Sequence, residues 1–473
     1  MAHTPTTTQP SATATATQIT SLVRGLSFTD SVLLMVGGII GSGIFLTAGP
    51  IAVAVRRPLL FLGVWLAGGL ISLLACFAFA EMGAMFPEAG GQYVFLREAF
   101  GEFPAFLYGW MVFTVIQSGG IAAIAVGFAD YLGAFWPVVA AHAPVARIGG
   151  WTLTRGDLVA VACIVLLTAI NVVGLKRGAA LINLATVAKF AAIGGFVLLG
   201  FTIGHGHWSN FSTSVASHQP FSFSQTLSGF GVGLIAVFWA FDGWVYVSWA
   251  AGEIKNPQRV LPRTMVLGIV IVIVVYLLIN GVYLYALPMA QIAKEETIAQ
   301  TAAVALFSSD AARWLSAMIA LSCFGALASC ILPGARVPYA MARDGVFFHA
   351  MGRVHPRYCT PAVSLIGLSA LGIVFTLSGS FDQLLTYSIF MSVVAYAAAV
   401  AGIFVLRRKR PDVPRPYRCT GYPYLPALYV IVSAAWALNS VVTRPKETLI
   451  GIGIVLLGVP FYWFWRRQAF DRA

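Results

Sequence analysis

Apolar runs of helical length recur along almost the whole chain, and short polar or charged joints separate them. None of the runs has the short apolar–polar alternation that is typical of a membrane barrel strand. A helix needs about 20 apolar residues to cross the bilayer core, and these runs are of that order. The twelve runs lie at residues 30–53, 58–86, 99–135, 156–174, 178–204, 225–253, 262–287, 300–340, 362–378, 383–405, 424–442 and 448–465. The pattern predicts an all-α integral membrane protein with twelve transmembrane helices.

The composition excludes a soluble protein. Hydrophobic residues make up 59% of the chain and charged residues only 10%, whereas soluble domains usually carry roughly a quarter charged residues. The net charge of +12 would suggest a nucleic-acid partner in a soluble protein. In a membrane protein the same excess is expected from basic cytoplasmic loops. We therefore expect the lipid bilayer, and no nucleic acid, as a partner.

The distribution of basic residues predicts the orientation. An even number of spans places both termini on one side. With the termini inside, 20 of the 29 Lys and Arg residues lie in cytosolic segments, 8 lie on the opposite face, and Lys189 lies within a span. The positive-inside rule then predicts cytoplasmic termini in the inner or plasma membrane of a bacterial-type cell. Residues 1–29, rich in Thr, Ser and Ala, are expected to be a disordered cytosolic tail, and residues 466–473 a second cytosolic tail.

Two of the runs contain residues that disfavour an unbroken helix. The first run contains Gly41-Ser42-Gly43 at mid-span, which is a poor helix interior. The alternative is close packing, because Gly37 and Gly41 form a G-x-x-x-G pattern. The sixth run contains Asp242, and an aspartate at membrane depth needs partners. It could cap a restarting helix, carry a proton or bind a ligand.

The two irregular runs hold corresponding positions in two five-run halves, residues 30–204 and 225–405. Glycine-interrupted segments at matching positions indicate a transporter binding site at the interface of two repeats. Because five is odd, the second half is predicted to be inverted relative to the first. Residues 424–465 then supply two further helices.

A pair of broken helices exposes main-chain groups that suit a zwitterion. Free amides at the start of the outer half of the first helix would attract a carboxylate. Free carbonyls at the ends of the inner half of the first helix and the outer half of the sixth could accept from an ammonium. An amino acid offers both groups. Trp239 and Phe241 lie where a ring could cover the bound molecule, although lipid or core packing explains each of them equally well.

Enzymatic chemistry is not indicated. The sequence contains no nucleophile–base constellation, phosphate-binding loop or dinucleotide fingerprint, so we predict no catalytic residues and no cofactor. His205 and His207 lack further ligands nearby, and no metal site is expected. Four cysteines lie within spans and two in reducing cytosolic loops, so no structural disulfide is expected. A channel would need a continuous polar pore instead of two interrupted helices. A sensor would bind its ligand but would not transport it.

Several motifs in chain order resemble the amino acid–polyamine–organocation (APC) superfamily. Residues 37–45 (GGIIGSGIF) resemble the superfamily's first-helix signature. Further stretches resemble its L-type amino acid transporter (LAT) branch, namely residues 80–93 (AEMGAMFPEAGGQY), 242–244 with 253–262, 342–345 with 355–356, and 406–411 with 415–417. The resemblance extends from about residue 25 to 465.

The resemblance implies an inverted 5+5 repeat of the leucine-transporter (LeuT) type, with two peripheral helices. It implies a substrate site formed by Ile40, Gly41, Ser42, Gly43, Trp239, Ala240, Phe241, Asp242 and Gly243. In that site the amides of residues 41–43 hold the carboxylate, the carbonyls of Ile40 and Trp239 take the amine, and Trp239 is the aromatic gate. Many relatives have Tyr where this chain has Phe241, so a hydrogen bond from that hydroxyl is missing here.

Lys189 is predicted to lie near the middle of the membrane, about 18 Å along its helix from Arg177. A lone buried lysine indicates a functional site. Relatives carry a lysine here, near the place where sodium-coupled relatives bind an ion. It could be a fixed ammonium that replaces sodium and tethers helix 1 to helix 8, or it could exchange a proton during transport. The third alternative is that Lys189 has no functional role and that its side chain extends toward the membrane–water interface.

Two carboxylates are candidates for bracing or gating the cytosolic joints. We expect Glu81 to form an ion pair at the inner end of helix 2. We expect Glu253 to form one together with Lys255 and Arg259. Such pairs could differ between inward-open and outward-open states.

The predicted function is sodium-independent exchange of small or mid-sized neutral L-amino acids by alternating access. Proton-coupled symport and amino acid/polyamine antiport are the alternatives. Animal relatives are linked to a single-span glycoprotein through a cysteine in the outer loop after helix 3. Residues 136–155 contain no cysteine, so no disulfide-linked heavy chain is expected.

Overall fold

The computed structural model describes residues 22–470, apart from residues 140, 150, 216–221, 296, 379–380 and 444. Most of the predicted tail 1–29 and the end of the predicted tail 466–473 therefore lie outside the described residues. Within the described part, eleven helices are long and apolar enough to cross a membrane. The ninth predicted span corresponds to a shorter apolar helix, α17 (Ala362–Ser378). The prediction of an all-helical membrane protein is confirmed.

The first predicted half contains ten helical elements among the described residues. They are α1 (Phe28–Ile39), α2 (Gly43–Leu46), α3 (Ala48–Val55), α4 (Pro58–Met85), α5 (Gln92–Phe100), α6 (Glu102–Met111), η1 (Val112–Ile116), α7 (Gln117–Phe135), α8 (Arg155–Val173) and α9 (Leu175–Thr202). The element η1 is a π-helical turn, and α6, η1 and α7 form one continuous span.

Among the described residues, one short helix, η2, precedes the second predicted half, eleven helical elements belong to that half, and two long helices follow it. They are η2 (Trp208–Phe211), α10 (Phe223–Phe241), α11 (Tyr246–Trp249), η3 (Ala251–Glu253), α12 (Pro257–Ala286), α13 (Met289–Ile292), α14 (Ile298–Leu306), α15 (Ser309–Gly334), α16 (Arg336–Arg343), η4 (His349–Gly352), α17, α18 (Phe381–Lys409), α19 (Tyr424–Thr443) and α20 (Pro445–Phe470). Helix α20 thus continues past residue 466, where the sequence predicts a tail.

Polar residues fix the starts of several helices. Ser27 accepts from the amide of Asp30 and Asp30 accepts from the amide of Ser27, which is a capping box at α1. Thr154 and Asp157 form the same motif at α8. Each box satisfies main-chain amides that have no partner inside the helix.

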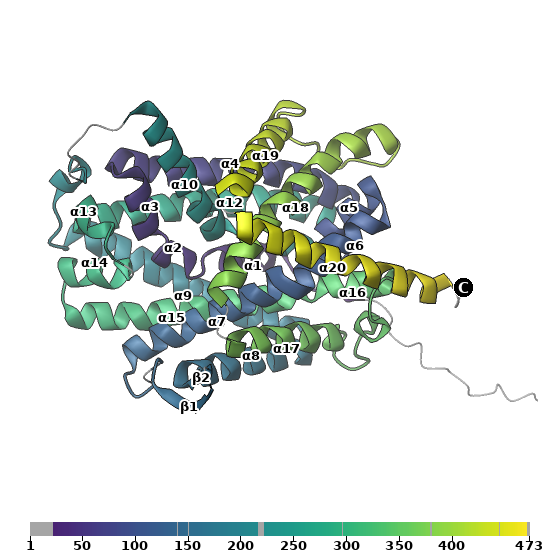
Figure 1. Cartoon of the computed structure of the whole chain (residues 1–473), viewed down its shortest axis with the longest axis horizontal. Helices are drawn as coiled ribbons and strands as arrows, with labels where there is room; N and C mark the ends of the chain where they lie inside the picture. Colours follow the sequence, from purple (N-terminus) through teal and green to yellow (C-terminus); the bar gives the residue numbers. More distant parts are fainter. Residues whose placement is uncertain are drawn as a thin grey trace, which may run out of the picture.

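A two-stranded antiparallel hairpin is the principal departure from the predicted fold. It consists of β1 (Pro144–Ile148) and β2 (Trp151–Thr154), in the joint between α7 and α8. Strands of four or five residues are too short to be predicted from apolar runs of membrane length. The hairpin lies at one edge of the bundle (Figure 1).

The long helices run side by side across Figure 1, so the bundle has two ends. We call the end with α5 and α16 the α5 end, and the end with α3, α13 and α14 the α14 end. Inside the bundle α4 packs along α12, and α7 packs along α15. Two short helices follow the interruptions in the spans and position the candidate site. Helix α2 contacts α3, α10 and α14, and α11 contacts α1, α12 and α15.

Candidate substrate site

The first span leaves the helical path where the glycines predict it. Helix α1 ends at Ile39, and the next helix begins at Gly43. A Cβ atom at Gly43 would lie 2.8 Å from Cα of Ala240, so only glycine lets the two broken spans approach this closely. The close-packing explanation also holds for Gly37, because a Cβ there would lie 2.3 Å from Oγ1 of Thr186 on α9.

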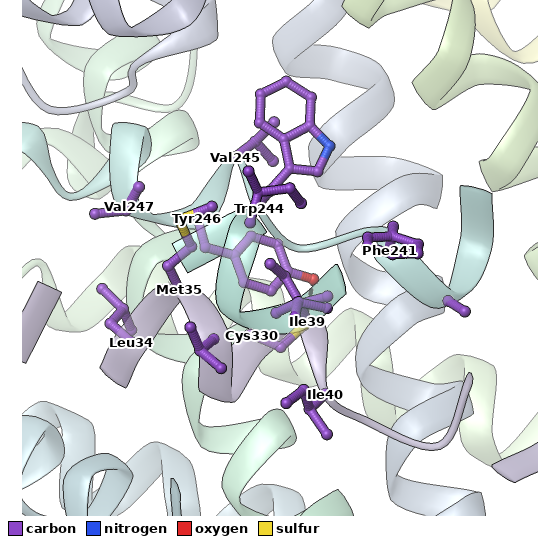
Figure 2. Packing of buried hydrophobic residues seen from close by; sticks show 14 of the residues in the cluster. Leu34, Met35, Ile39, Ile40, Phe241, Trp244, Val245, Tyr246, Val247 and Cys330 are labelled. Carbon is purple, nitrogen blue, oxygen red and sulfur yellow. Dashed lines mark hydrogen bonds between the residues drawn. The ribbon is translucent and has the colours of Figure 1, made fainter. Parts of the chain in front are cut away.

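The sixth span breaks beside the first. Helix α10 ends at Phe241 and α11 begins at Tyr246. Gly243 has a φ of +104°, and a Cβ there would lie 2.9 Å from the carbonyl oxygen of Gly38. Glycine is therefore required both for the turn and for the contact between the two breaks. Figure 2 shows Tyr246 beside the end of α1, and its hydroxyl lies 3.6 Å from Sγ of Cys330.

Asp242 does not cap the restarting helix. The N-cap residue of α11 is Val245, and no side chain caps it. Instead Oδ1 of Asp242 accepts a hydrogen bond of 2.5 Å from the hydroxyl of Tyr396 on α18. Proton carriage and ligand binding by Asp242 stay predictions.

Tyr276 on α12 connects the two breaks. Its hydroxyl lies 3.0 Å from the carbonyl oxygen of Ile39 and 2.8 Å from that of Ala240. Both carbonyls lie near helix ends, and that of Ile39 also accepts from the amide of Gly41 at 2.8 Å. Tyr276 was not among the predicted site residues, although a hydroxyl within an apolar span is the kind of group that satisfies a broken helix.

Lys189 reaches the end of α1 from α9. Its Nζ donates to the carbonyl oxygen of Gly37 at 3.0 Å and also to that of Ile40. Ser322 on α15 donates to the same Ile40 oxygen at 3.3 Å. The lysine is only 1% exposed. Two donors therefore already point at the Ile40 oxygen, which has two lone pairs and is the oxygen where the resemblance places the substrate amine.

A hollow opens at the two breaks, and we call it the break hollow. Its volume is about 640 Å³ including space open to the outside, within the ~300–1,000 Å³ of small-molecule sites. Its lining comes from both breaks, α7 and α18, and consists of Gly38, Ile39, Gly41, Ser42, Gly43, Ile116, Gln117, Gly120, Ala123, Ile124, Trp239, Ala240, Asp242, Tyr246 and Ile389. Six of the nine predicted substrate residues therefore meet here.

The amides at the first break differ in availability. The amide of Gly41 donates to the carbonyl of Ile39 at 2.8 Å. The amides of Ser42 and Gly43 donate to no acceptor among the described residues. Since both residues line the break hollow, their amides are the main-chain donors that a bound carboxylate could reach.

Phe241 lies away from the break hollow. Its ring packs against Tyr276 at 4.9 Å and Trp65 at 6.5 Å between centroids. Gln117, which was not predicted as a site residue, does line the hollow, and its Nε2 donates to the carbonyl of Cys330 at 2.6 Å. An amide side chain inside an apolar run was a usable signal for it.

Asp242 also faces a second hollow, on the side of α19, which we call the α19 hollow. Its volume is about 430 Å³ including open space. Trp239, Asp242 and Ile389 line both hollows. The carboxylate of Asp242 thus stands at the boundary between two cavities.

The two predicted bracing carboxylates are buried at the α5 end. Glu81 pairs with Arg407 at 2.6 Å and accepts from the amide of Cys419 at 2.6 Å. Glu253 pairs with Arg336 through two bonds of 2.7 and 2.8 Å.

The predicted partners of Glu253 were wrong. Lys255 and Arg259 follow it on the same chain segment, but α16 brings Arg336 onto the carboxylate. The carbonyl of Glu253 also accepts from the amides of Gly25 and Leu26. Glu253 therefore connects the start of α1 with the segment after the second break and with α16.

Metal ligation is not apparent in the part of the chain that the structure describes, where no three His, Cys, Asp or Glu side chains gather.

Comparison with known proteins agrees with this geometry. The family model described as amino acid permease matches residues 26–459. The chain is 29% identical over 456 residues to the serine/threonine exchanger SteT of Bacillus subtilis, covering 96% of this chain and 99% of that protein. It is 27% identical to the b(0,+)-type amino acid transporter 1 of Mus musculus (95% and 89% covered) and 26% identical to the Asc-type amino acid transporter 1 of Mus musculus (96% and 84% covered). The chain therefore belongs to the amino acid permease family of the APC superfamily and is an amino acid transporter of its LAT-like branch.

Proposed function

We propose that the protein exchanges neutral L-amino acids across the membrane by alternating access and without sodium. The observation that carries this proposal is the pair of unpaired amides at Ser42 and Gly43, which face the break hollow. They offer fixed partial positive charge to a carboxylate in a cavity that has no cationic side chain in its lining. The similarity to a serine/threonine exchanger supports exchange and a small substrate.

In the proposed complex, the α-carboxylate lies on the amides of Ser42 and Gly43. The ammonium group lies on the carbonyl of Trp239, since the carbonyl of Ile40 is occupied by Lys189 and Ser322. The Trp239 carbonyl already accepts from the amide of Asp242 at 3.1 Å and has a second lone pair. The indole of Trp239 covers the bound molecule.

Lys189 is proposed to act as a fixed ammonium in place of a sodium ion. It donates to two carbonyls at the end of α1, while Ser322 links the same carbonyl to α15. A cation bound there would need these oxygens as ligands, and the ammonium already uses them. This arrangement supports sodium independence and a tether between helices 1 and 8.

The position of the Asp242 carboxylate favours a second candidate function. This function is the exchange of cationic substrates, including amino acid/polyamine antiport. Its carboxylate lines both hollows and has a single side-chain donor, Tyr396, among the described residues. A substrate with a second amine could place that amine on Asp242 while its α-carboxylate stays on the first break.

We further propose that the two five-helix halves form an inverted repeat. The protein would lie in the cell membrane with its α5 end facing the cytosol. The excess of basic residues in the segments at that end supports this orientation. No disulfide-linked heavy chain is proposed, since the outer joint 136–155 has no cysteine.

Counterflow in proteoliposomes tests the function. Vesicles preloaded with unlabelled serine should accumulate labelled serine without sodium and without a proton gradient. Flux that requires an imposed proton gradient would replace exchange with symport. Competition by neutral amino acids, cationic amino acids and polyamines separates the two candidate substrate classes.

A further inference from the structure

Two neutral polar side chains line the break hollow without a role in the proposed complex. They are Gln117 on α7 and Tyr246 on α11. Both are buried, with 1% and 7% of their surfaces exposed. In the proposed complex the carboxylate and the amine of the substrate lie on main-chain groups. These two side chains are therefore available to the third part of an amino acid, its side chain.

The sulfur of Cys330 on α15 fixes where the two side chains lie. Nε2 of Gln117 is 3.0 Å from Sγ of Cys330, and the hydroxyl of Tyr246 is 3.6 Å from the same sulfur (Figure 2). A Cβ atom at Gly120, one turn after Gln117 on α7, would lie 3.9 Å from it. Three residues that line the hollow thus meet around one atom. We call this part of the break hollow the Cys330 corner.

The polar groups of the Cys330 corner suit a hydroxyl. The hydroxyl of Tyr246 donates to the thiol sulfur, and sulfur is a weak acceptor. The hydroxyl oxygen of a ligand would accept from Tyr246 more strongly. The hydrogen of that ligand hydroxyl could be donated to the side-chain carbonyl of Gln117. The corner therefore offers both a donor and an acceptor, and a hydroxyl group uses both.

Space and charge at the corner favour a short neutral side chain. Apart from the backbone of its own helix, Sγ of Cys330 is the one described atom within 4 Å of a Cβ placed at Gly120. Gly120 therefore leaves open room beside the two polar side chains. The described lining of the break hollow includes no Lys, Arg or His, so a carboxylate on the substrate side chain would have no cationic side chain to pair with.

We propose that the Cys330 corner recognises a hydroxyl on the side chain of the transported amino acid, with Tyr246 as its donor and Gln117 as its acceptor. This inference rests on the proposed function, which places the α-carboxylate at the first break. It adds the substrate class, a neutral amino acid with a short hydroxylated side chain. It also makes Gln117 and Tyr246 specificity-determining residues, while Gly120 provides room for the methyl group of threonine.

Binding of two amino acids that differ mainly by a hydroxyl tests the proposal. The purified full-length protein in detergent is titrated with threonine and with valine, and each Kd is obtained from thermal stabilisation. Threonine should bind about tenfold more tightly than valine, the value of one or two neutral hydrogen bonds. Tyr246→Phe and Gln117→Leu should each reduce this ratio to about threefold or less, and the Kd of valine should change by less than about twofold.

The matched control removes a buried hydroxyl elsewhere. Tyr108 donates to Gln92 and lines neither hollow, so Tyr108→Phe should keep the ratio of the wild type. If Gln117→Leu does not purify, Tyr246→Phe suffices, since it retains the ring and its contact with Trp249 at 5.2 Å between centroids.

Gly120→Ala tests the room at the corner. The added methyl group meets no described side-chain atom closer than 3.9 Å, so the protein should fold as the wild type does. Threonine should lose at least threefold more affinity than serine, because its extra methyl group competes for the same space. Equal losses for serine and threonine would contradict the placement of the substrate side chain at this corner.

The results separate this inference from the proposed function. Equal Kd values for threonine and valine in the wild type would overturn the inference and leave the function intact. Equal losses for both in Tyr246→Phe would give the hydroxyl a structural role and also overturn it. If no neutral amino acid binds, the proposed substrate class is wrong, and this inference fails with it. Because binding is measured without a membrane gradient, the outcome does not depend on whether transport is exchange or symport.

Discussion

The two helix breaks lie against each other, yet they satisfy their polar groups in opposite ways. At the first break the carbonyls of Gly37 and Ile40 accept hydrogen bonds from Nζ of Lys189 on another helix. At the second break the chain itself supplies a charge, the carboxylate of Asp242, and its side-chain partner is the neutral hydroxyl of Tyr396. A side-chain donor from another helix thus occupies the carbonyl side of one break, while a carboxylate-bearing residue at the other lines two cavities.

This difference suggests that the two breaks have different roles in substrate binding. The carbonyl end of the first break is filled by the protein, so it serves as a fixed support. Its amide end, at Ser42 and Gly43, is open to the break hollow. The second break contributes the groups that can discriminate between substrates, Trp239 and Asp242. Changes at the first break should therefore affect all substrates alike, and changes at the second should affect selectivity.

Lys189→Ala should have the largest effect. It leaves two buried carbonyls without a strong donor, at a cost of about 1–3 kcal/mol each, so transport should fall by about 100-fold or more for every substrate. The measurement is the counterflow rate per inserted protein. Lys176→Ala, at an exposed position of the same helix, is the matched control. Rates near the wild type in Lys189→Ala would remove the lysine from the mechanism.

Asp242→Asn should have a selective effect. If the carboxylate binds a substrate amine, the apparent affinity for cationic substrates should fall about 10–100-fold, the value of a hydrogen bond to a charged group. Neutral substrates should change by less than about threefold. Competition assays with both classes measure this, and Asp310→Asn, at an exposed position, is the control. An equal loss of apparent affinity for cationic and neutral substrates would contradict the proposed roles of the two breaks.

Trp239→Ala should raise the half-saturating concentration by about tenfold, because a buried aromatic contact is worth on the order of 1–2 kcal/mol. Trp239 lines both hollows, so the order of preferred substrates should also change. Trp239→Phe should restore most of the affinity. An unchanged substrate profile in Trp239→Ala would show that the indole does not cover the substrate.

Tyr276→Phe should have the smallest effect of the four. It removes the hydroxyl that touches the carbonyls of Ile39 and Ala240, at about 1 kcal/mol, or roughly fivefold in rate. The ring contacts with Phe241 and Trp65 remain. A loss as large as that of Lys189→Ala would mean that the connection between the breaks, and not the lysine, is the main support.

The sequence predicts the breaks but not the contacts that satisfy them. Gly41-Ser42-Gly43 and Asp242-Gly243 are local signals, since the residues themselves disfavour a helix or require a partner. The partners depend on packing between segments far apart in the chain. That is why Tyr276 was missed, why Arg336 was not predicted for Glu253, and why the orientation of Phe241 away from the hollow could not be foreseen.

A structure of the transporter with its amino acid bound would test the central claim most directly. The account predicts that the two carboxylate oxygens lie within about 3.2 Å of the amide nitrogens of Ser42 and Gly43, while Lys189 keeps its bonds to Gly37 and Ile40. A substrate held by Lys189 or by side chains alone, with both amides unoccupied, would contradict it.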